Sequence, residues 1–441
     1  MPNTRDPRDT REPFSAGSVA RQLDYCTFCP KMCRHACPVS TASGRETYIP
    51  QAKMDRLNQL RLGHSAWATE STDPLWACTG CRHCTMYCDH GNEPGLVLLT
   101  GRATAVGRGL PHPALTGYSE RFRAREQRLS AQLASMFDAQ HRAGGGEIGY
   151  WPGCDAIDKG AGDISAALAG YSERFRAREE RLSAQLASGF KEHLATEGEI
   201  GLWPGCDAID KGAADIAAAM ALFERTGLDV KIIEAPQACA GYPLLAAGHR
   251  DLFRWHAGRV ASSLRGFRKV AINCSACLYA MRSQYAAEGV NLRAEIVSLA
   301  DVLAPAAQNL ACPVKPRPVY YHDPCYNARY NNVVEQPRRA LTQLAEVREF
   351  SWNKNDTECC GGGGLLPKTM PLVADQMAKR RLAEVQATGG GLVVTSCATC
   401  TFMLKRNAPP SVEVANLATA MAQLSETPYT APPSSPLDDD A

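Results

Sequence analysis

Eight cysteines in two short runs near the start of the chain have the residue type and spacing that bind iron–sulfur clusters. The first run has spacings of two, three and three residues and ends in Cys-Pro, whereas the second has spacings of two, two and three. The members are Cys26, Cys29, Cys33 and Cys37, followed by Cys78, Cys81, Cys84 and Cys88. Short spacings let consecutive backbone turns aim three thiolates at one cubane, while the fourth cysteine points elsewhere. The two runs therefore predict electron transfer through two [4Fe-4S] clusters.

The fourth cysteine of each run is expected to ligate the cluster of the other run, as in two-cluster ferredoxins. This crossing defines cluster site 1 as Cys26, Cys29, Cys33 and Cys88, and cluster site 2 as Cys37, Cys78, Cys81 and Cys84. Structural zinc is the alternative, because CxxC pairs also bind zinc tetrahedrally. Zinc sites usually pair two short knuckles, whereas each run here supplies four thiols. A zinc-stabilised, non-redox scaffold therefore ranks last.

A second group of thiols follows one plan twice in the C-terminal half: a lone cysteine, a cysteine before glycine, and a CxxC pair. The later copy, called the five-cysteine set, comprises Cys325, Cys359, Cys360, Cys397 and Cys400. The earlier copy, called the four-cysteine set, comprises Cys206, Cys239, Cys274 and Cys277. It has Ala240 where the second adjacent cysteine would stand. Five thiols exceed what zinc needs. For the four-cysteine set, a cubane and a structural role both stay open.

These motifs resemble a known family. The Cys-Cys-Gly sequence at 359–361 is similar to the cysteine-rich domains of heterodisulfide reductase, and the segment 322–325, His-Asp-Pro-Cys, matches the start of such a domain. A dicluster ferredoxin followed by two such domains resembles the iron–sulfur subunit of glycolate oxidase and of related flavin enzymes, over about residues 21–425. The resemblance implies that the five-cysteine set holds a noncubane iron–sulfur centre.

The source of the electrons is expected to be another protein. The glycine motif at 144–149 precedes a strand, whereas a dinucleotide site needs it to follow one and open a helix. The glycine run at 361–364 resembles a phosphate loop, but Pro367 stands at the glycine position before Lys368. We expect a flavoprotein dehydrogenase partner, which by the resemblance oxidises a 2-hydroxy acid, and an acceptor such as a quinone. In the alternative hypothesis, the chain is a heterodisulfide reductase-like enzyme that reduces a disulfide at the five-cysteine set. Either interpretation makes it an oxidoreductase subunit.

Composition excludes several other classes. A net charge of +2 gives no reason to expect a nucleic-acid partner. No run of about 18 apolar residues predicts a membrane span, and the polar residues 1–15 do not resemble a signal peptide. Nineteen cysteines without an export signal favour cluster ligation in a reducing, cytoplasmic compartment. A peripheral place on the inner membrane, through a partner, stays open.

The expected fold class is α+β and multidomain: a helical dicluster ferredoxin domain followed by two α/β cysteine-rich domains. Alternating strands and helices from about residue 199 favour largely parallel sheets. The expected parts are a disordered tail at 1–20, the dicluster domain at 21–110, a duplicated helical segment at 117–198, the first cysteine-rich domain at 199–310, the second at 311–425, and a disordered tail at 426–441. Expected strands are 199–203, 228–233, 269–273, 318–322 and 391–395, and expected helices are 51–62, 244–264, 275–287 and 370–387.

The duplicated segment gives two cysteines the same context. The sequence WPGCDAIDKGA occurs at 151–161 and again at 203–213, so Cys154 and Cys206 cannot be told apart by type. Spacing favours Cys206, because 32 residues separate it from Cys239, as 33 separate the first two members of the five-cysteine set. Cys154 is expected to be a spare loop thiol and Cys312 an ordinary buried one.

Three histidines lie near these motifs. His35 and His83 fall between cluster ligands. They could hydrogen-bond near the sulfurs and tune the potential, or be plain surface residues. His322 could donate a proton beside the last centre, although a histidine that caps the backbone at a strand end is the simpler interpretation.

Overall fold

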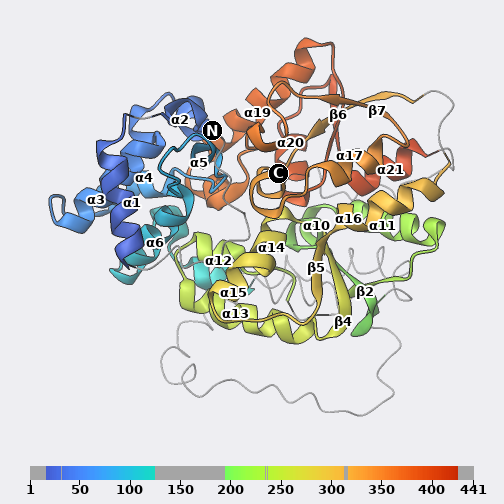
Figure 1. The fold of residues 1–441 in the computed structure, drawn as a ribbon, viewed down its shortest axis with the longest axis horizontal. Coiled ribbons are helices and arrows are strands. Elements are labelled where there is room, and N and C mark those ends of the chain that lie inside the picture. The colour runs from blue at the N-terminus through green and yellow to red at the C-terminus, as the bar shows by residue number, and fades with distance from the viewer. Residues whose placement is uncertain are drawn as a thin grey trace, which may run out of the picture.

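The computed structural model describes residues 16–30, 32–124, 194–233, 235, 237–311 and 316–425. The expected tails at 1–15 and 426–441 lie outside the described residues. So do Cys312 and residues 125–193, which include Cys154 and most of the two repeat copies. Figure 1 shows a helical unit, blue to cyan, beside two sheet-containing units drawn in green to yellow and in orange to red. Among the described residues, no helix has the length and apolar character needed to cross a membrane.

The first unit is helical. Its elements are α1 Ala16–Phe28, η1 Arg34–Ala36, α2 Pro38–Ser43, η2 Glu46–Tyr48, α3 Pro50–Leu62, α4 Thr69–Trp76, α5 His83–Met86, α6 Pro94–Gly107 and η3 Pro113–Leu115. Helices α2, α3 and α6 each begin at a proline, whose fixed φ suits the first helical position. Their shared core includes Met54, Trp76 and Leu98, all at most 1% exposed. Residues 16–20, expected in a tail, instead open α1.

The second unit is built on a five-stranded sheet in the order β1-β3-β2-β4-β5, and every pairing in it is parallel. The strands are β1 Leu194–Ala195, β2 Glu197–Trp203, β3 Val230–Ile233, β4 Gly266–Ile272 and β5 Glu295–Ser298. The helices are α10 Cys206–Lys211, α11 Ala213–Thr226, α12 Tyr242–Ala246, α13 Arg250–Ser263, α14 Ser275–Tyr279, the π-helix η6 Ala280–Gln284, α15 Tyr285–Ala287, α16 Leu299–Ala306 and η7 Ala307–Asn309. Residues 194–195 and 197–198, expected in a duplicated helical segment, therefore belong to strands β1 and β2.

The third unit repeats this plan with a four-stranded parallel sheet in the order β7-β6-β8-β9. The strands are β6 Pro318–His322, β7 Glu346–Glu349, β8 Gly391–Thr395 and β9 Val412–Asn416. The helices are the π-helix η8 Asn327–Asn331, α17 Glu335–Leu341, η9 Lys354–Asp356, η10 Gly363–Leu365, α18 Leu366–Thr369, α19 Pro371–Ala387, α20 Ala398–Lys405 and α21 Leu417–Leu424. The expected fold class, a helical unit followed by two α/β units, is confirmed.

One expected helix is broken for a reason that lies in another unit. The pattern predicts a single helix at 244–264, but the structure has α12 and α13 with Gly248 between them. Gly248 has a φ of +85°, and a Cβ there would lie 2.8 Å from the carbonyl oxygen of Arg102. Glycine is therefore required where the second unit approaches α6 of the first.

The buried guanidinium of Arg102 joins all three units. Arg102 is 1% exposed, and it donates hydrogen bonds to the carbonyl oxygens of Leu75, Trp76, Cys78, Ala246 and Gly364. Its guanidinium also lies 5.2 Å from the ring centroid of Trp76. Burial lowers the pKa of Arg102 from its ordinary value, so the carbonyl groups stabilise the charged form that desolvation disfavours.

Replacing Arg102 with methionine is expected to lower the free energy of unfolding by at least about 3 kcal/mol, because buried carbonyl oxygens would lose their charged donor. Urea denaturation measures this change. Arg108→Met, at the exposed end of the same helix and 4.9 Å from the ring of Trp67, is the matched control and should cost under about 1 kcal/mol. Equal losses in the two variants would contradict the joining role.

Candidate functional site

The four thiols expected for cluster site 1 lie together at the end of α1. Burial raises the pKa of Cys26 to about 12, and the nearby thiols of Cys88, Cys33 and Cys29 raise it further, while a hydrogen bond from Asn92 opposes the rise. The Nδ2 atom of Asn92 lies 3.1 Å from the Sγ of Cys26. Mutually repelling thiolates in one place favour a bound cationic centre. Their role as ligands stays a prediction.

The four thiols expected for cluster site 2 line one cavity between the two cysteine runs. Burial raises the pKa of Cys84, and the thiols of Cys81, Cys33, Cys78 and Cys37 add to this. The donor set is four sulfurs with little access to water, which suits a cubane better than a harder ion.

A buried lysine that sequence reasoning missed lies in the same cavity. Lys53 of α3 is 2% exposed, and its Nζ lies 3.3 Å from the Sγ of Cys37. Burial alone would lower the pKa of Lys53, but Cys37, Cys78 and Cys84 outweigh it, and the pKa is raised. Conversely, Lys53 lowers the pKa of Cys37 despite the burial of that thiol. The pair therefore places a thiolate beside an ammonium group. The pattern of apolar residues at 51–62 does not indicate that Lys53 is buried beside a cysteine.

The five-cysteine set gathers at the carboxyl ends of β6 and β8. The Sγ atoms of Cys360 and Cys400 are 3.2 Å apart. Side-chain contacts link Cys325 to Cys359, Cys359 to Cys360, and Cys400 to Cys397. All five side chains are at most 4% exposed. The structure therefore brings together every residue expected there.

The four-cysteine set gathers in the same way around β2 and β4. Side-chain contacts link Cys277 to Cys239 and to Cys274, and Cys206 is close enough to raise the pKa of Cys277 further. Ala240, at the position of the missing cysteine, is completely buried. Its carbonyl oxygen accepts a hydrogen bond of 2.9 Å from the hydroxyl of Tyr285, so this turn is packed into the protein.

The two cysteine-rich sets meet, which the sequence did not predict. A side-chain contact joins Cys274 to Cys397. The hydroxyl of Ser275 donates to the Sγ of Cys397 at 3.1 Å, and the backbone N–H of Ala398 donates to the carbonyl oxygen of Asn273 at 3.2 Å. Each CxxC loop therefore packs on the other, and nine thiols form one array.

Glycines let the dicluster unit approach the five-cysteine set. A Cβ on Gly363 would lie 2.4 Å from the carbonyl oxygen of Thr79, and one on Gly364 would lie 2.2 Å from that of Cys78. The side chain of Thr79 donates to Cys359 and helps to lower its pKa. The glycine run after Cys360 is thus a close-approach surface, in keeping with its rejection as a nucleotide loop.

Two arginines and two tyrosines form hydrogen bonds between the dicluster unit and the third unit at the same contact. Arg329 Nε donates to the carbonyl oxygen of Cys81 at 2.5 Å, and Arg82 Nη1 donates to the carbonyl oxygen of Arg329 at 3.0 Å. The hydroxyl groups of Tyr326 and Tyr330 donate to the carbonyl oxygens of Thr79 and Gly80, at 3.0 and 2.8 Å. The loop between the first two cysteines of the second run is therefore fixed by residues of the third unit.

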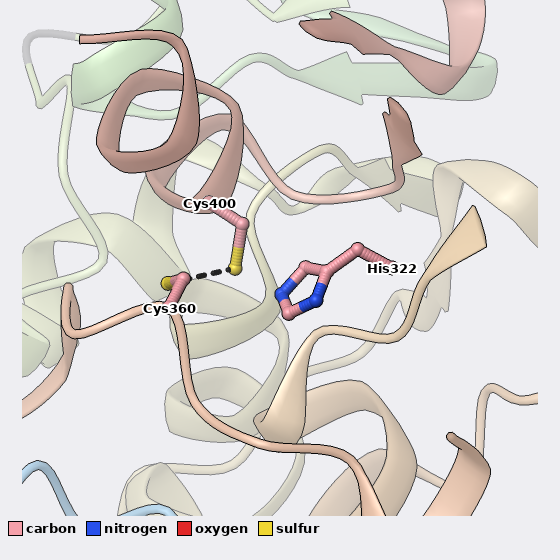
Figure 2. Close-up of side chains that lie close together, drawn as sticks. All are labelled: His322, Cys360 and Cys400. Carbon is pink, nitrogen blue, oxygen red and sulfur yellow. Dashed lines mark hydrogen bonds between the residues drawn. The ribbon is translucent and has the colours of Figure 1, made fainter. Parts of the chain in front are cut away.

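The three histidines differ in their surroundings. His35 is exposed and its ring packs edge-on against Tyr87. His83 is 3% exposed, so a surface role is wrong for it; burial lowers its pKa to about 4. His322 does not cap the backbone with its ring, because Nδ1 accepts a hydrogen bond from Nε of Arg381 at 3.1 Å. Figure 2 shows the ring of His322 facing the sulfurs of Cys360 and Cys400.

Comparison with known proteins agrees with this arrangement. Residues 22–92 match the 4Fe-4S dicluster domain, and residues 200–282 and 319–405 each match the cysteine-rich domain. The chain therefore combines a dicluster domain for two [4Fe-4S] clusters with two cysteine-rich domains, which in heterodisulfide reductase-like proteins bind a further iron–sulfur cluster. A zinc-only scaffold does not fit these matches.

Three curated relatives cover parts of the chain. One subunit of the fumarate reductase (CoM/CoB) from Methanothermobacter marburgensis is 26% identical over 50% of this chain and 45% of its own length. A probable membrane-anchored ferredoxin from Chromohalobacter salexigens is 37% identical over 28% of this chain and 18% of its own length. One subunit of the dihydromethanophenazine:CoB–CoM heterodisulfide reductase from Methanosarcina barkeri is 25% identical over 48% of this chain and 54% of its own length. The chain thus spans about half or less of each of these relatives.

Replacing Lys53 with methionine is expected to lower the reduction potential of the cluster at site 2, because the added electron loses a buried positive neighbour. The expected shift is on the order of 59 mV, a tenfold change for a one-electron couple. An EPR-monitored redox titration measures it. Arg61→Met removes an exposed charge from the same helix, where Arg61 pairs with Asp24, and should leave the potential of site 2 unchanged. The same potential in both variants would contradict this role.

Proposed function

We propose that this iron–sulfur protein, a dicluster domain joined to two cysteine-rich domains, is an electron-transfer subunit. It receives electrons from a partner flavoprotein dehydrogenase at cluster site 1 and delivers them through cluster site 2 to the five-cysteine set. An acceptor such as a quinone then takes them. The observation that carries the proposal is the unbroken order in which the four groups of thiols lie.

Each group of thiols lies close enough to the next for their charges to interact. Between sites 1 and 2, Cys33 is near enough to raise the pKa of Cys84. Between site 2 and the five-cysteine set, the pKa of Cys81 is raised to about 11. Burial is the main cause of this rise, and the thiol of Cys359 adds to it. The contact of Cys274 with Cys397 then joins the four-cysteine set. Short steps of this kind suit one-electron transfer in series.

The exposure of the thiols indicates at which end of the series a protein partner docks. Three of the four thiols of site 1 are partly exposed, whereas every thiol of the two cysteine-rich sets is buried. Two large apolar side chains beside site 1 are exposed, Phe28 at 86% and Met32 at 57%. Exposed apolar groups beside a redox site favour docking of a protein partner there. We therefore place the donor at cluster site 1.

The bound clusters supply the one-electron carriers, and the chain supplies their positions and surroundings. Lys53 gives site 2 a positive neighbour, Arg102 and the glycine run hold it against the third unit, and burial excludes water from the inner thiols. These features set potentials and fix the gaps between sites.

Three finer points rest on the resemblance and on relatives' names. A 2-hydroxy acid is the proposed substrate of the donor, because the order of domains resembles that of the glycolate oxidase iron–sulfur subunit. Placement in the cytoplasm, peripheral to the inner membrane, is proposed partly from the relative named a probable membrane-anchored ferredoxin. The donor dehydrogenase and the acceptor quinone are both molecules separate from this chain.

A second candidate function has its own support. In it, the chain is a heterodisulfide reductase-like enzyme, and the two cysteine-rich sets act together on a disulfide. The contact of Cys274 with Cys397 favours this candidate, because the contact brings the two cysteine-rich sets together. One relative belongs to a heterodisulfide reductase. Turnover of a mixed disulfide by the isolated, chemically reduced chain would support this candidate over the first.

Metal analysis and EPR of the anaerobically purified chain test both candidates. Iron with labile sulfide is expected, and zinc without sulfide would refute both. Co-purification of a flavoprotein supports the first candidate.

Replacing Gly363 with alanine is expected to slow electron passage from the dicluster unit to the five-cysteine set at least about tenfold, because the new Cβ would lie 2.4 Å from the carbonyl oxygen of Thr79 and separate the two. Photoreduced deazaflavin is the donor, and rapid-freeze EPR follows the order of reduction. Gly107→Ala, whose Cβ meets nothing within 4 Å, is the control. Reduction of the five-cysteine set before the dicluster sites would contradict the proposed direction.

The duplicated motif gives a separate prediction. Cys206→Ser should disturb the four-cysteine set, because Cys206 lies among its thiols, and should change the iron content or the EPR spectrum. Cys154→Ser should leave both unchanged. Equal loss of iron from the two variants would show that the choice of Cys206 over Cys154 is wrong.

A further inference from the structure

One ring nitrogen of a buried histidine faces the five-cysteine set without a partner. His322 is completely buried, and its Nε2 has no hydrogen-bond partner within the described part of the chain. A nitrogen of its ring and the Sγ atoms of Cys360 and Cys400 all lie within 4.8 Å of one another. In Figure 2 the nitrogen remote from the Cβ of His322 faces the two sulfurs. A buried polar atom without a partner needs an explanation.

Arg381 fixes where the proton of this ring lies. Its Nε donates to Nδ1 of His322 at 3.1 Å, and a guanidinium can only donate. Nδ1 must therefore present a lone pair, so the proton of the neutral ring is on Nε2. The guanidinium is itself held, because Nη2 donates to the carbonyl oxygen of Trp352 at 2.6 Å and the group lies 3.9 Å from the ring centroid of Phe350. Arg381 is 2% exposed.

This tautomer excludes a role that proximity alone would suggest. His322, Cys360 and Cys400 could be taken for a three-residue metal site. A metal-binding histidine needs a lone pair on the nitrogen that faces the metal, and usually donates from its other nitrogen to an acceptor. Here the arrangement is reversed: the nitrogen that faces the sulfurs carries the proton, and the other accepts.

We propose that His322 donates a hydrogen bond from Nε2 to the sulfurs of the iron–sulfur centre at the five-cysteine set, with its tautomer set by Arg381, and is not an iron ligand. This hydrogen bond raises the reduction potential of that centre, because an N–H group beside sulfur stabilises the negative charge gained on reduction. Arg381 is the positioning residue. The inference rests on the proposed iron–sulfur centre, not on the direction of electron flow.

The first test uses the unmodified full chain, purified anaerobically and labelled with ¹⁵N-histidine. Pulsed EPR of the five-cysteine centre should show weak coupling to one histidine nitrogen and an exchangeable proton nearby. Strong coupling of the size given by an iron-bound nitrogen would overturn the inference while leaving the proposed function intact. Absence of any centre at the five-cysteine set would overturn both.

The second test uses variants, with the potential of the centre as the readout. His322→Leu removes the donor and should make reduction about tenfold less favourable, a shift of about 59 mV for one electron. His322→Gln restores an N–H donor and should recover most of that change, with the iron content kept in both variants. His256→Leu, which alters a buried histidine whose ring contacts the carbonyl oxygen of Cys239 instead, is the matched control and should leave this potential unchanged. Loss of iron from the Gln variant, or an unchanged potential in the Leu variant, would overturn the inference.

Discussion

The guanidinium of Arg102 is the interaction on which the arrangement of the three units depends. A cation buried to 1% exposure is tolerated only if its donors are satisfied, and here they meet carbonyl oxygens of all three units. One of these carbonyls belongs to Cys78 and another to Gly364. The same side chain therefore fixes the second cysteine run against the glycine turn that follows Cys360. Gly248, packed on the backbone of Arg102, brings the second unit to the same point.

The second constraint is electrostatic. None of the seventeen described cysteines forms a disulfide, and many raise the pKa of their neighbours. Such a collection is costly unless positive charge offsets it. In the proposed function, bound iron supplies positive charge at these sites, and the chain adds its own. Lys53 lowers the pKa of Cys37. Burial raises the pKa of Cys81. The pKa of Cys325 is raised by the contact of Cys325 with Cys359. Arg329 opposes the rise in both thiols.

The accuracy of the sequence-based expectations follows from how local each signal is. Strands β6 and β8 have the expected bounds, because buried parallel strands are continuous apolar runs between turn residues. Strand β7, Glu346–Glu349, was missed because it is a short, polar edge strand with no apolar pattern. The break between α12 and α13 was missed although Gly248 is a local signal for a helix end. That this glycine also packs on the backbone of Arg102, far away in sequence, is visible only in the tertiary structure.

The sequence by itself predicted how the thiols are grouped. Spacing within each short run and each CxxC pair identifies thiols that can share a centre, because those contacts are made within one or two turns of the chain. The members that lie further apart were grouped by the plan that the chain repeats and by the family resemblance. Only the tertiary structure decided the order of the sets, the contact of Cys274 with Cys397, the ammonium of Lys53 at site 2 and the tautomer of His322. Each of these depends on a hydrogen bond or contact between residues from different elements. Spacing along the chain carries no information about such pairs, so the eight cysteines of the opening runs could predict clusters but not where their electrons go.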